Sequence, residues 1–251
     1  TNLGLLTFNF ENDYLALASI GTIADLVPLI GPTRSLVKYG LEAFGKIKRQ
    51  GLKHIFKEAG LESRRITPYE IGFIIAPRIN AVGRLEHAID ALRLLCTTNE
   101  KRAHYLASKA SNKNIQRQTL VEKSVEEAKK QIKNLNKILI LISDKWHEGI
   151  IGLVASKIAE EFYRPTIVLT KTNGFLKGSA RSIPNFHITN FLRTLKKYLI
   201  DVGGHQQAAG FTLEEKQLDK FYQSAQKLAA SLIDEKILEK TIEVDLKIPL
   251  S

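Results

Sequence analysis

The sequence of 251 residues contains one cysteine, Cys96, and no methionine. A lone cysteine cannot form an internal disulfide, and the C-x-x-C spacings of zinc and redox sites are absent. No apolar run approaches the roughly 18 residues that a membrane span needs, and no basic-then-apolar leader is present. These absences favour a cytoplasmic protein. Without a methionine, Thr1 is not a translation start, and we expect the sequence to be a piece of a longer chain.

Acidic residues are scarce relative to basic ones, 26 against 37, and the formal net charge is +11. Residues 45–65 hold seven basic and two acidic residues, residues 101–133 hold nine and three, and from Leu213 onward the balance reverses to six and eight. Basic blocks of this kind indicate a polyanion such as nucleic acid, whose phosphates release counterions when they are neutralised. The alternative is a solvated helix face, which lysines decorate routinely.

The first half of the chain predicts a strand and several helices. The apolar run 15–20 is interpreted as a strand that ends at Gly21–Asp25. Thr33 predicts the cap of one helix, and Thr67-Pro-Tyr-Glu70 predicts the start of another that stops before Pro77. A further helix is expected over 87–95. Residues 99–133 contain no Gly or Pro and predict one long connecting helix.

The second half alternates strands and helices, which predicts an α/β fold. Strands are expected over 137–142, 165–169, 175–182 and 211–213, with helices over 149–162, 190–198 and 215–239. Asn173-Gly174 is typical of a hairpin turn, and residues 242–248 alternate like the first strand of a further domain. We therefore divide the chain into 1–98, a connecting helix 99–133, a second domain 134–240 and the start of another domain at 241–251.

Candidate functional residues in the first half lie in two segments. Asp25 follows the predicted strand at its carboxyl end, where it could bind a metal or cap the next helix. Arg78, Asn80 and Arg84 lie in a segment marked by Pro and Gly that is interpreted as a loop. Arginine forks suit phosphate oxygens, although pairing with acids such as Glu86 is the alternative.

The second half offers three more candidate segments. His147 lies before a helix, where it could touch a substrate or cap, and Trp146 beside it could stack on a base or fill the core. Ser179 and Arg181 share one side of a strand and could hold a phosphate. His205 stands at the tip of a glycine-rich loop that begins at Gly203-Gly204.

Taken together, these segments resemble a known family. The runs 21–29, 76–84, 146–152, 178–182 and 203–205 occur in the order and with roughly the spacing of RecJ-type single-strand-specific exonucleases, which belong to the DHH phosphoesterase superfamily. The resemblance implies the C-terminal part of a DHH domain over 1–98, the connecting helix, and a smaller DHH-associated domain over 134–240. It further implies an active site between the two domains and an oligonucleotide-binding barrel after residue 240.

The same resemblance implies roles for the candidate residues. The family uses two metal ions, Mn²⁺ or Mg²⁺, and Asp25 matches its last metal-binding acid. The other metal motifs of the family are expected upstream of Thr1, so the piece alone is expected to be inactive or nearly so. Arg84, Ser179 and Arg181 match positions that hold a terminal 5′ phosphate, with Arg78 and Asn80 shaping that site. His205 matches a histidine that faces the substrate, and His147 is a possible DNA contact.

The implied function is part of a 5′-to-3′ exonuclease for single-stranded DNA in DNA repair and recombination. The expected partner is single-stranded DNA, with a helicase or a single-strand-binding protein as further candidates, and a monomer is expected. A short-oligonucleotide or cyclic-dinucleotide phosphodiesterase of the same superfamily is the nearer alternative. A catalytically inactive replication scaffold is an alternative of another class.

Overall fold

The structure is a computed structural model that describes residues 11–62, 64–241, 244 and 246. It separates into two compact units, with the division between Gln118 and Thr119 inside the long helix α6 (Glu100–Gln131). That helix bears out the expectation of one long helix over 99–133. The strand expected over 242–248 falls on residues of which only Val244 and Leu246 are described, and the domain boundaries stay a prediction. No helix among the described residues is long and apolar enough to cross a membrane.

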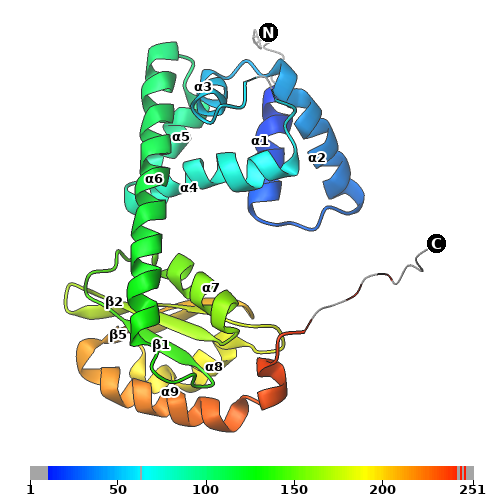
Figure 1. Cartoon of the computed structure of the whole chain (residues 1–251). Helices are drawn as coiled ribbons and strands as arrows, with labels where there is room; N and C mark the ends of the chain where they lie inside the picture. The colour runs from blue at the N-terminus through cyan, green and yellow to red at the C-terminus, as the bar shows by residue number, and fades with distance from the viewer. Residues whose placement is uncertain (1–10, 63, 242–243, 245, 247–251) are drawn as a thin grey trace, which may run out of the picture. The chain divides into compact units, whose positions relative to one another are not determined.

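The first unit consists of helices in its described part (Figure 1). Its core is formed by apolar side chains of α1, α3, α5 and the helical segment 70–85, including the fully buried Leu52, Ile55, Ile71, Ile75 and Leu94. Its elements are α1 (Glu11–Ala24), α2 (Gly31–Ala43), a 3-10 turn η1 (Phe44–Lys46), α3 (Gln50–Glu58), a π-helical segment η2 (Glu70–Ile75), α4 (Ala76–Leu85), α5 (Ile89–Cys96) and the first part of α6.

The expected strand before Asp25 is wrong, because residues 11–24 form α1. Ala16, Ile20 and Ile23 are buried at intervals of four and three residues, which is the spacing of one helix face. The short apolar run 15–20 hid this period, since a run of that length fits a strand or a buried helix equally well. Asp25 therefore follows the C-terminus of a helix.

The predicted helix end before Pro77 and the predicted loop over 76–84 are also wrong. Glu70 accepts the Thr67 backbone N–H at 2.9 Å, so the capping interaction was predicted correctly. The helix then continues through η2 into α4, with Pro77 in the first turn of α4. The wide π turn changes the hydrogen-bond pattern just before Pro77, where the missing proline N–H is tolerated.

The second unit contains a five-stranded sheet in the order β1-β2-β3-β5-β4. β1 and β2 are parallel, as expected for strands joined through a helix, and the other pairs are antiparallel. Asn173 and Gly174 have φ angles of 49° and 81°, so they form the predicted tight hairpin. The strands are β1 (Leu139–Ile142), β2 (Thr166–Thr172), β3 (Phe175–Arg181), β4 (Asp201–Gly204) and β5 (Ala208–Glu214).

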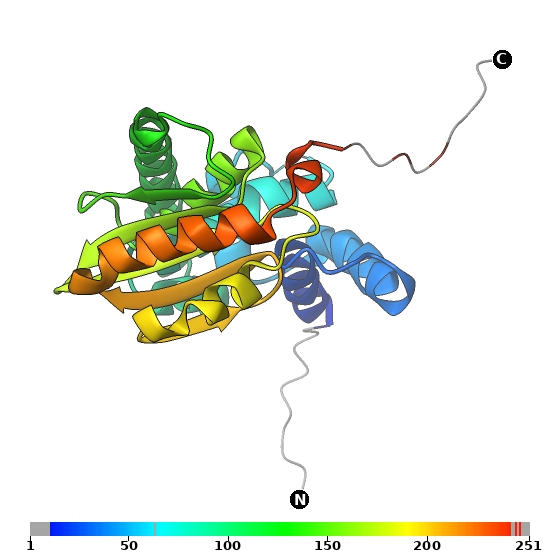
Figure 2. The same cartoon turned by 90° about the horizontal axis from the view of Figure 1, so that it is seen from below.

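Helices cover the two faces of this sheet differently (Figures 1 and 2). On one face, α8 (Ile188–Thr194) and α9 (Leu218–Leu232) close a core around Leu169, Leu176, Phe211 and Phe221. On the other face, α7 (Ile151–Phe162) packs against β2 and β3. The final helix is shorter than the expected 215–239. Short 3-10 turns lie at η3 (Lys196–Tyr198), η4 (Glu215–Gln217) and η5 (Glu235–Leu238).

Candidate functional site

Ser179 and Arg181 share one face of β3, as their spacing predicted, and this face meets α7. Arg181 donates from Nε to Ser156 Oγ at 3.1 Å and from Nη1 to Ser179 Oγ at 3.2 Å and to the Ala180 carbonyl at 2.9 Å. These bonds hold the guanidinium of a half-buried side chain in one orientation. We call Ser156, Ser179 and Arg181 the Arg181 cradle. Such a pre-oriented fork suits a phosphate or carboxylate.

Gly152 on α7 allows the helix to approach this cradle. A Cβ atom at position 152 would lie 2.9 Å from Arg181 Nη2 and 3.0 Å from Ser179 Oγ. Gly152 and Ser156 are four residues apart and share one helix face. The sequence reasoning missed both residues as parts of the site. Small residues at this spacing, within an otherwise apolar helix face, were the available signal.

The sheet surface beside the cradle is open and has few side chains. Ser179, Gly210 and Gly203 lie in one row across β3, β5 and β4. A Cβ atom built on Gly203 would meet no atom within 4 Å, and one built on Gly210 would meet only the Gly178 carbonyl, at 4.0 Å. This row leaves a flat floor on which a ligand could approach the backbone closely.

His205 lies at the same end of the sheet as Arg181. Gly203 and Gly204, which precede His205, belong to β4 rather than to a loop. Only the turn after Gly204 therefore agrees with the predicted glycine-rich loop. Gly204 has φ of 145°, and a Cβ there would lie 2.3 Å from the Ala208 carbonyl, so the position requires glycine. The buried Thr189 hydroxyl donates to the His205 carbonyl, and Ser182 N donates to the Gln207 carbonyl at 2.9 Å. These bonds fix the turn beside the end of β3, while the His205 side chain stays exposed.

The Trp146-His147 segment serves the fold. His147 Nδ1 accepts the Gly149 backbone N–H at 3.0 Å, which caps the approach to α7. Trp146 is 4% exposed, and its Nε1 donates to Glu127 on α6 at 2.9 Å. Of the alternatives left open for these residues, the cap and the core position are the ones observed. His147 remains exposed, so a DNA contact stays a prediction.

The helical conformation of 76–85 separates the three candidates Arg78, Asn80 and Arg84. At about 100° per residue, Asn80 and Arg84 share one face of α4 and Arg78 points elsewhere. Arg78 Nη1 donates to the Ile74 carbonyl at 2.7 Å within its own helix. Burial lowers the pKa of Arg78, and the nearby charge of Glu58 raises it. Burial also lowers the pKa of Arg84.

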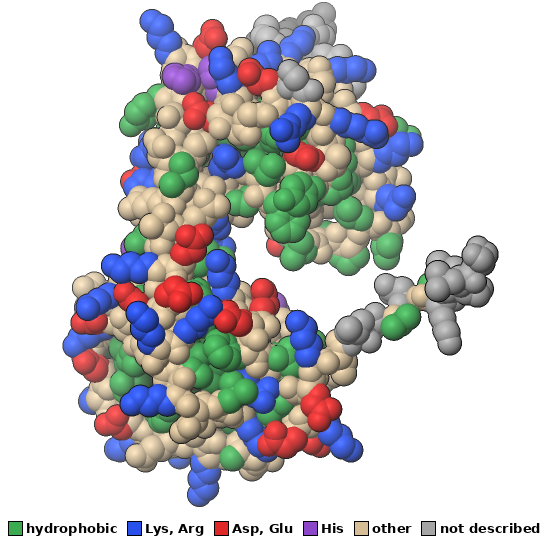
Figure 3. Space-filling view, in the orientation of Figure 1, with side chains coloured by type: hydrophobic (Ala, Val, Ile, Leu, Met, Phe, Trp, Pro, Cys, Tyr) green, Lys and Arg blue, Asp and Glu red, His purple; other side chains and the backbone are tan. Residues whose placement is uncertain are grey.

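Asp25 is exposed, directly after the C-terminus of α1. Its backbone N–H donates to the Gly21 carbonyl at 3.0 Å, and Leu26 beside it adopts a left-handed φ of 54° with 87% exposure. The C-terminus of a helix carries a partial negative charge, so a carboxylate there is electrostatically unfavourable. Hydrophobic side chains reach the surface in this part of the helical unit (Figure 3). An accessible carboxylate oxygen is the donor that hard divalent cations prefer.

A complete metal site is not formed by the described residues, in which no group of three or more His, Cys, Asp and Glu side chains could hold an ion. Asp25 offers one carboxylate of the kind that binds a divalent cation.

Several residues of the basic blocks have structural partners. Arg49 lies 3.9 Å from the buried Asp13 and donates to the Leu95 carbonyl at 2.8 Å. On α6, Lys109 and Lys113 pair with Glu86, and Lys129 pairs with Glu161 at 2.9 Å. Part of the positive charge is therefore neutralised within each unit.

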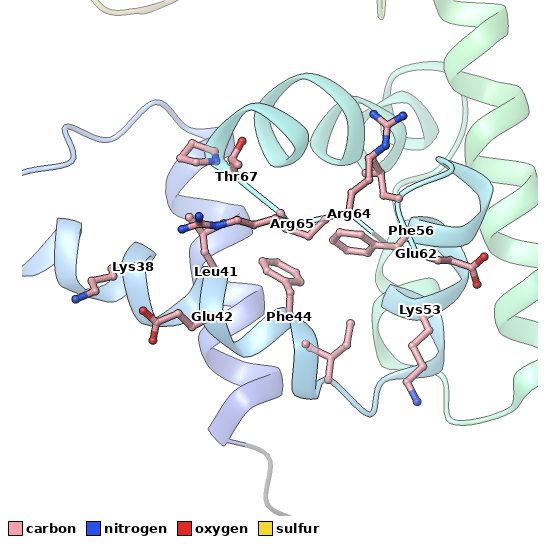
Figure 4. Close-up of a pocket in the computed structure, with 15 residues that line it drawn as sticks. Lys38, Leu41, Glu42, Phe44, Lys53, Phe56, Glu62, Arg64, Arg65 and Thr67 are labelled. Atoms are coloured by element: carbon pink, nitrogen blue, oxygen red, sulfur yellow. The ribbon is translucent and has the colours of Figure 1, made fainter.

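A pocket of about 800 Å³ lies within the first unit, between α2, α3 and the segment 61–68 (Figure 4). Phe44 and Phe56 approach each other at its centre, with ring centroids 5.1 Å apart. The charged ends of Lys38, Glu42 and Lys53 point away from that apolar centre. None of the candidate residues lines the pocket.

Comparison with known proteins identifies the class first. Residues 135–231 match the DHHA1 domain family. The chain is 37% identical over 240 residues to the single-stranded-DNA-specific exonuclease RecJ of Bacillus subtilis and 35% identical over 222 residues to that of Thermus thermophilus. These matches cover 94% and 88% of this chain, but 30% and 32% of the relatives.

Solved structures agree with this assignment. The crystal structure of RecJ from T. thermophilus in complex with Mn²⁺ has a TM-score of 0.82 and 35% identity, covering 89% of this chain and 33% of that one. A structure of the same protein with Mg²⁺ matches with the same TM-score. The chain is therefore a RecJ-type member of the DHH phosphoesterase superfamily. It spans about a third of the length of these relatives.

Proposed function

We propose that this chain is part of a metal-dependent exonuclease that removes nucleotides from the 5′ end of single-stranded DNA, in DNA repair and recombination. Its similarity to RecJ proteins over most of its length supports the substrate class. The single observation that carries the proposal is the Arg181 cradle, whose guanidinium is already oriented by Ser156 and Ser179. In this proposal the protein acts as a monomer in the cytoplasm, with a helicase or a single-strand-binding protein as possible partners.

The Arg181 cradle is proposed to bind the terminal 5′ phosphate. A terminal phosphate carries a charge of about −1.5 to −2 and three acceptor oxygens, whereas a phosphodiester inside the strand carries one negative charge. A guanidinium fork therefore binds the terminal group more strongly than an internal one. The open row of Ser179, Gly210 and Gly203 leaves room for the nucleotide beside it. Arg84 and Asn80 on α4 are proposed to contact phosphate as well, with Arg78 in a supporting position.

Asp25 and His205 are proposed to act at the bond that is cut. Asp25 would supply one carboxylate ligand to a divalent cation, Mn²⁺ or Mg²⁺, which when bound supplies positive charge close to the phosphate. His205 is exposed on a turn fixed by Thr189 and is proposed to donate a hydrogen bond to the reacting phosphate. His147 caps the approach to α7 and would touch the strand only at its edge.

The test compares Arg181→Ala with His205→Ala in the complete gene product, using matched oligonucleotides with and without a 5′ phosphate. A hydrogen bond to a charged group contributes about 1.5–3 kcal/mol, so Arg181→Ala should lower kcat/KM about tenfold or more on the phosphorylated substrate. The loss on the 5′-hydroxyl substrate should be much smaller. His205→Ala should lower turnover on both substrates to a similar degree.

Lys177→Gln is the matched control, because Lys177 lies on the same face of β3 and its change also removes one positive charge. It should change activity on both substrates little and equally. Equal losses on the two substrates for Arg181→Ala would reduce its role to general charge attraction. Full activity of that variant on the phosphorylated substrate would contradict the proposed role altogether.

A further inference from the structure

The face of α6 that packs on the first unit changes character along its length. Ala103, Ala107 and Ala110 are fully buried on it. The next buried positions are polar, because Ser111 and Asn114 are only 8% and 5% exposed. Within the described residues, Ser111 Oγ and Asn114 Oδ1 find no hydrogen-bond partner. Buried polar groups without partners are unfavourable for folding, so this stretch of the helix needs an explanation other than packing.

Ion pairs bring this stretch of α6 beside the end of α4. Lys109 Nζ lies 2.7 Å from Glu86 Oε2, and Lys113 Nζ lies 2.8 Å from Glu86 Oε1. Arg117 is one turn beyond Lys113 on the same side of α6. Arg84, two residues before Glu86, is close enough for its charge to act on Arg117.

Arg117 has no compensating partner of the kind that Lys109 and Lys113 have. In the described part of the chain, no carboxylate pairs with it, and its buried Nε atom donates no hydrogen bond. Burial lowers the pKa of Arg117, and the positive charge of Arg84 lowers it further. Two partly buried cations that repel each other form a natural binding site for an anion.

We infer that Arg117, together with Arg84, binds a phosphate group of the nucleic-acid strand on the α4–α6 side of the first unit. The inference rests on the proposed function, which supplies the strand. It adds Arg117 to the residues of the first unit that bind phosphate. The guanidinium fork of Arg117 grips two oxygens of the phosphate, and the anion removes the repulsion between the two arginines. Asn80, one turn before Arg84, lies on the same face of α4.

The experiment measures binding of a fluorescent oligothymidylate with a 5′ hydroxyl group, so that no terminal phosphate reports on the Arg181 cradle. The proteins are the wild-type complete gene product, Arg117→Gln and Arg102→Gln. Arg102 is the matched control, because it is an exposed arginine on the same helix, about 22 Å away at 1.5 Å per residue. Dissociation constants are measured over a range of salt concentrations, and the melting temperature of each free protein is recorded.

Arg117→Gln should weaken binding about tenfold and lower the slope of log K against log salt by about 0.7, the loss of one phosphate contact on a single strand. The same change should raise the melting temperature of the free protein, because it removes the repulsion from Arg84. If Arg117 had a purely structural role, its replacement would lower the melting temperature. Arg117→Lys keeps the charge but loses the fork. Its affinity should fall between those of the wild type and Arg117→Gln.

Two results would overturn the inference alone: wild-type affinity in Arg117→Gln, or equal losses in Arg117→Gln and Arg102→Gln. Absence of binding by the wild-type protein would overturn the proposed function and the inference with it. An acidic peptide that competes with the oligonucleotide at wild-type Arg117, with no competition in Arg117→Gln, would assign the site to a protein partner and overturn the phosphate assignment.

Discussion

Arg181 in the sheet unit and Arg117 in the helical unit are held in opposite ways. In the sheet unit, Arg181 is held by the hydroxyl groups of Ser156 and Ser179 and by a backbone carbonyl. In the helical unit, Arg117 lies next to another cation, and its buried Nε has no partner within the described residues. The first arrangement is complete before a ligand arrives. The second is unfavourable until an anion is bound.

Asp25 resembles Arg117 in that its charge lies in an unfavourable electrostatic environment. Its carboxylate lies at the negative end of α1, and the neighbouring Leu26 is both left-handed and exposed. Local features that lower stability without a visible compensation are typical of functional sites. The helical unit therefore carries features that a ligand would relieve, whereas the sheet unit carries a site that needs only to stay undisturbed. This difference predicts how mutations in the two units will behave.

The largest effect is expected for Asp25→Ala in the complete gene product with Mn²⁺. Hydrolysis should fall by at least about a hundredfold, because loss of even a residue that only orients a metal ligand typically costs 10–100-fold. The melting temperature should stay the same or rise, since the variant removes an acid from the negative end of a helix. Glu42→Ala, which removes an acid from α2, is the control and should retain activity. Near-normal turnover of Asp25→Ala would show that Asp25 binds no essential metal.

A smaller effect is expected when the cradle is disturbed through Gly152. In Gly152→Ala, the new methyl group would lie 2.9 Å from Arg181 Nη2, the far end of a flexible side chain. The guanidinium can move, so the fold should survive while the preference for a 5′ phosphate falls several-fold. The measurement is the ratio of kcat/KM on phosphorylated and unphosphorylated oligonucleotides.

Gly178→Ala is the matched control for this variant, because it adds the same methyl group on β3, on the side that faces the core. There it would lie 2.3 Å from the Phe211 ring in the core. Overpacking of this kind typically costs about 1–3 kcal/mol, so this variant should lower the melting temperature instead. A change of substrate preference in Gly178→Ala at unchanged stability, or none in Gly152→Ala, would argue against a site held by close packing.

The sequence predicted the sheet unit better than the helical unit. Continuous apolar runs such as 138–142 and the Asn173-Gly174 turn carry their own local signals. The structure has the strands and the hairpin close to the expected positions. The pairing of Ser179 with Arg181 followed from the two-residue period of a strand, which does not depend on distant contacts. Ser156 and Gly152 were missed because they meet the strand only through the packing of α7.

The helical unit was harder for physical reasons. Apart from Ser19, the run 15–20 is apolar at every position, so its period could not separate a strand from a helix. Pro77 is a strong local signal for a helix end, but a π turn accommodates it, and no local pattern indicated that turn. Arg117 gave no signal at all. It was one of nine basic residues in the polar segment 101–133, and only the packing beside α4 distinguishes it.

The smallest effect concerns charges of the helical unit that need no ligand. Lys109 bonds Glu86 and Asp90, and these hydrogen bonds hold the pKa of both carboxyls below their usual range. A lowered pKa in the folded state contributes stability at pH values above the ordinary carboxyl pKa of about 4. This stability is lost as the pH falls through the lowered pKa values.

Lys109→Met should therefore lower the melting temperature slightly at pH 7, and the difference from the wild type should shrink steadily below about pH 5. Lys123→Met changes an exposed lysine on the same helix and should show no such dependence. A difference for Lys109→Met that stays constant down to pH 2 would contradict stabilisation through the charges of Glu86 and Asp90.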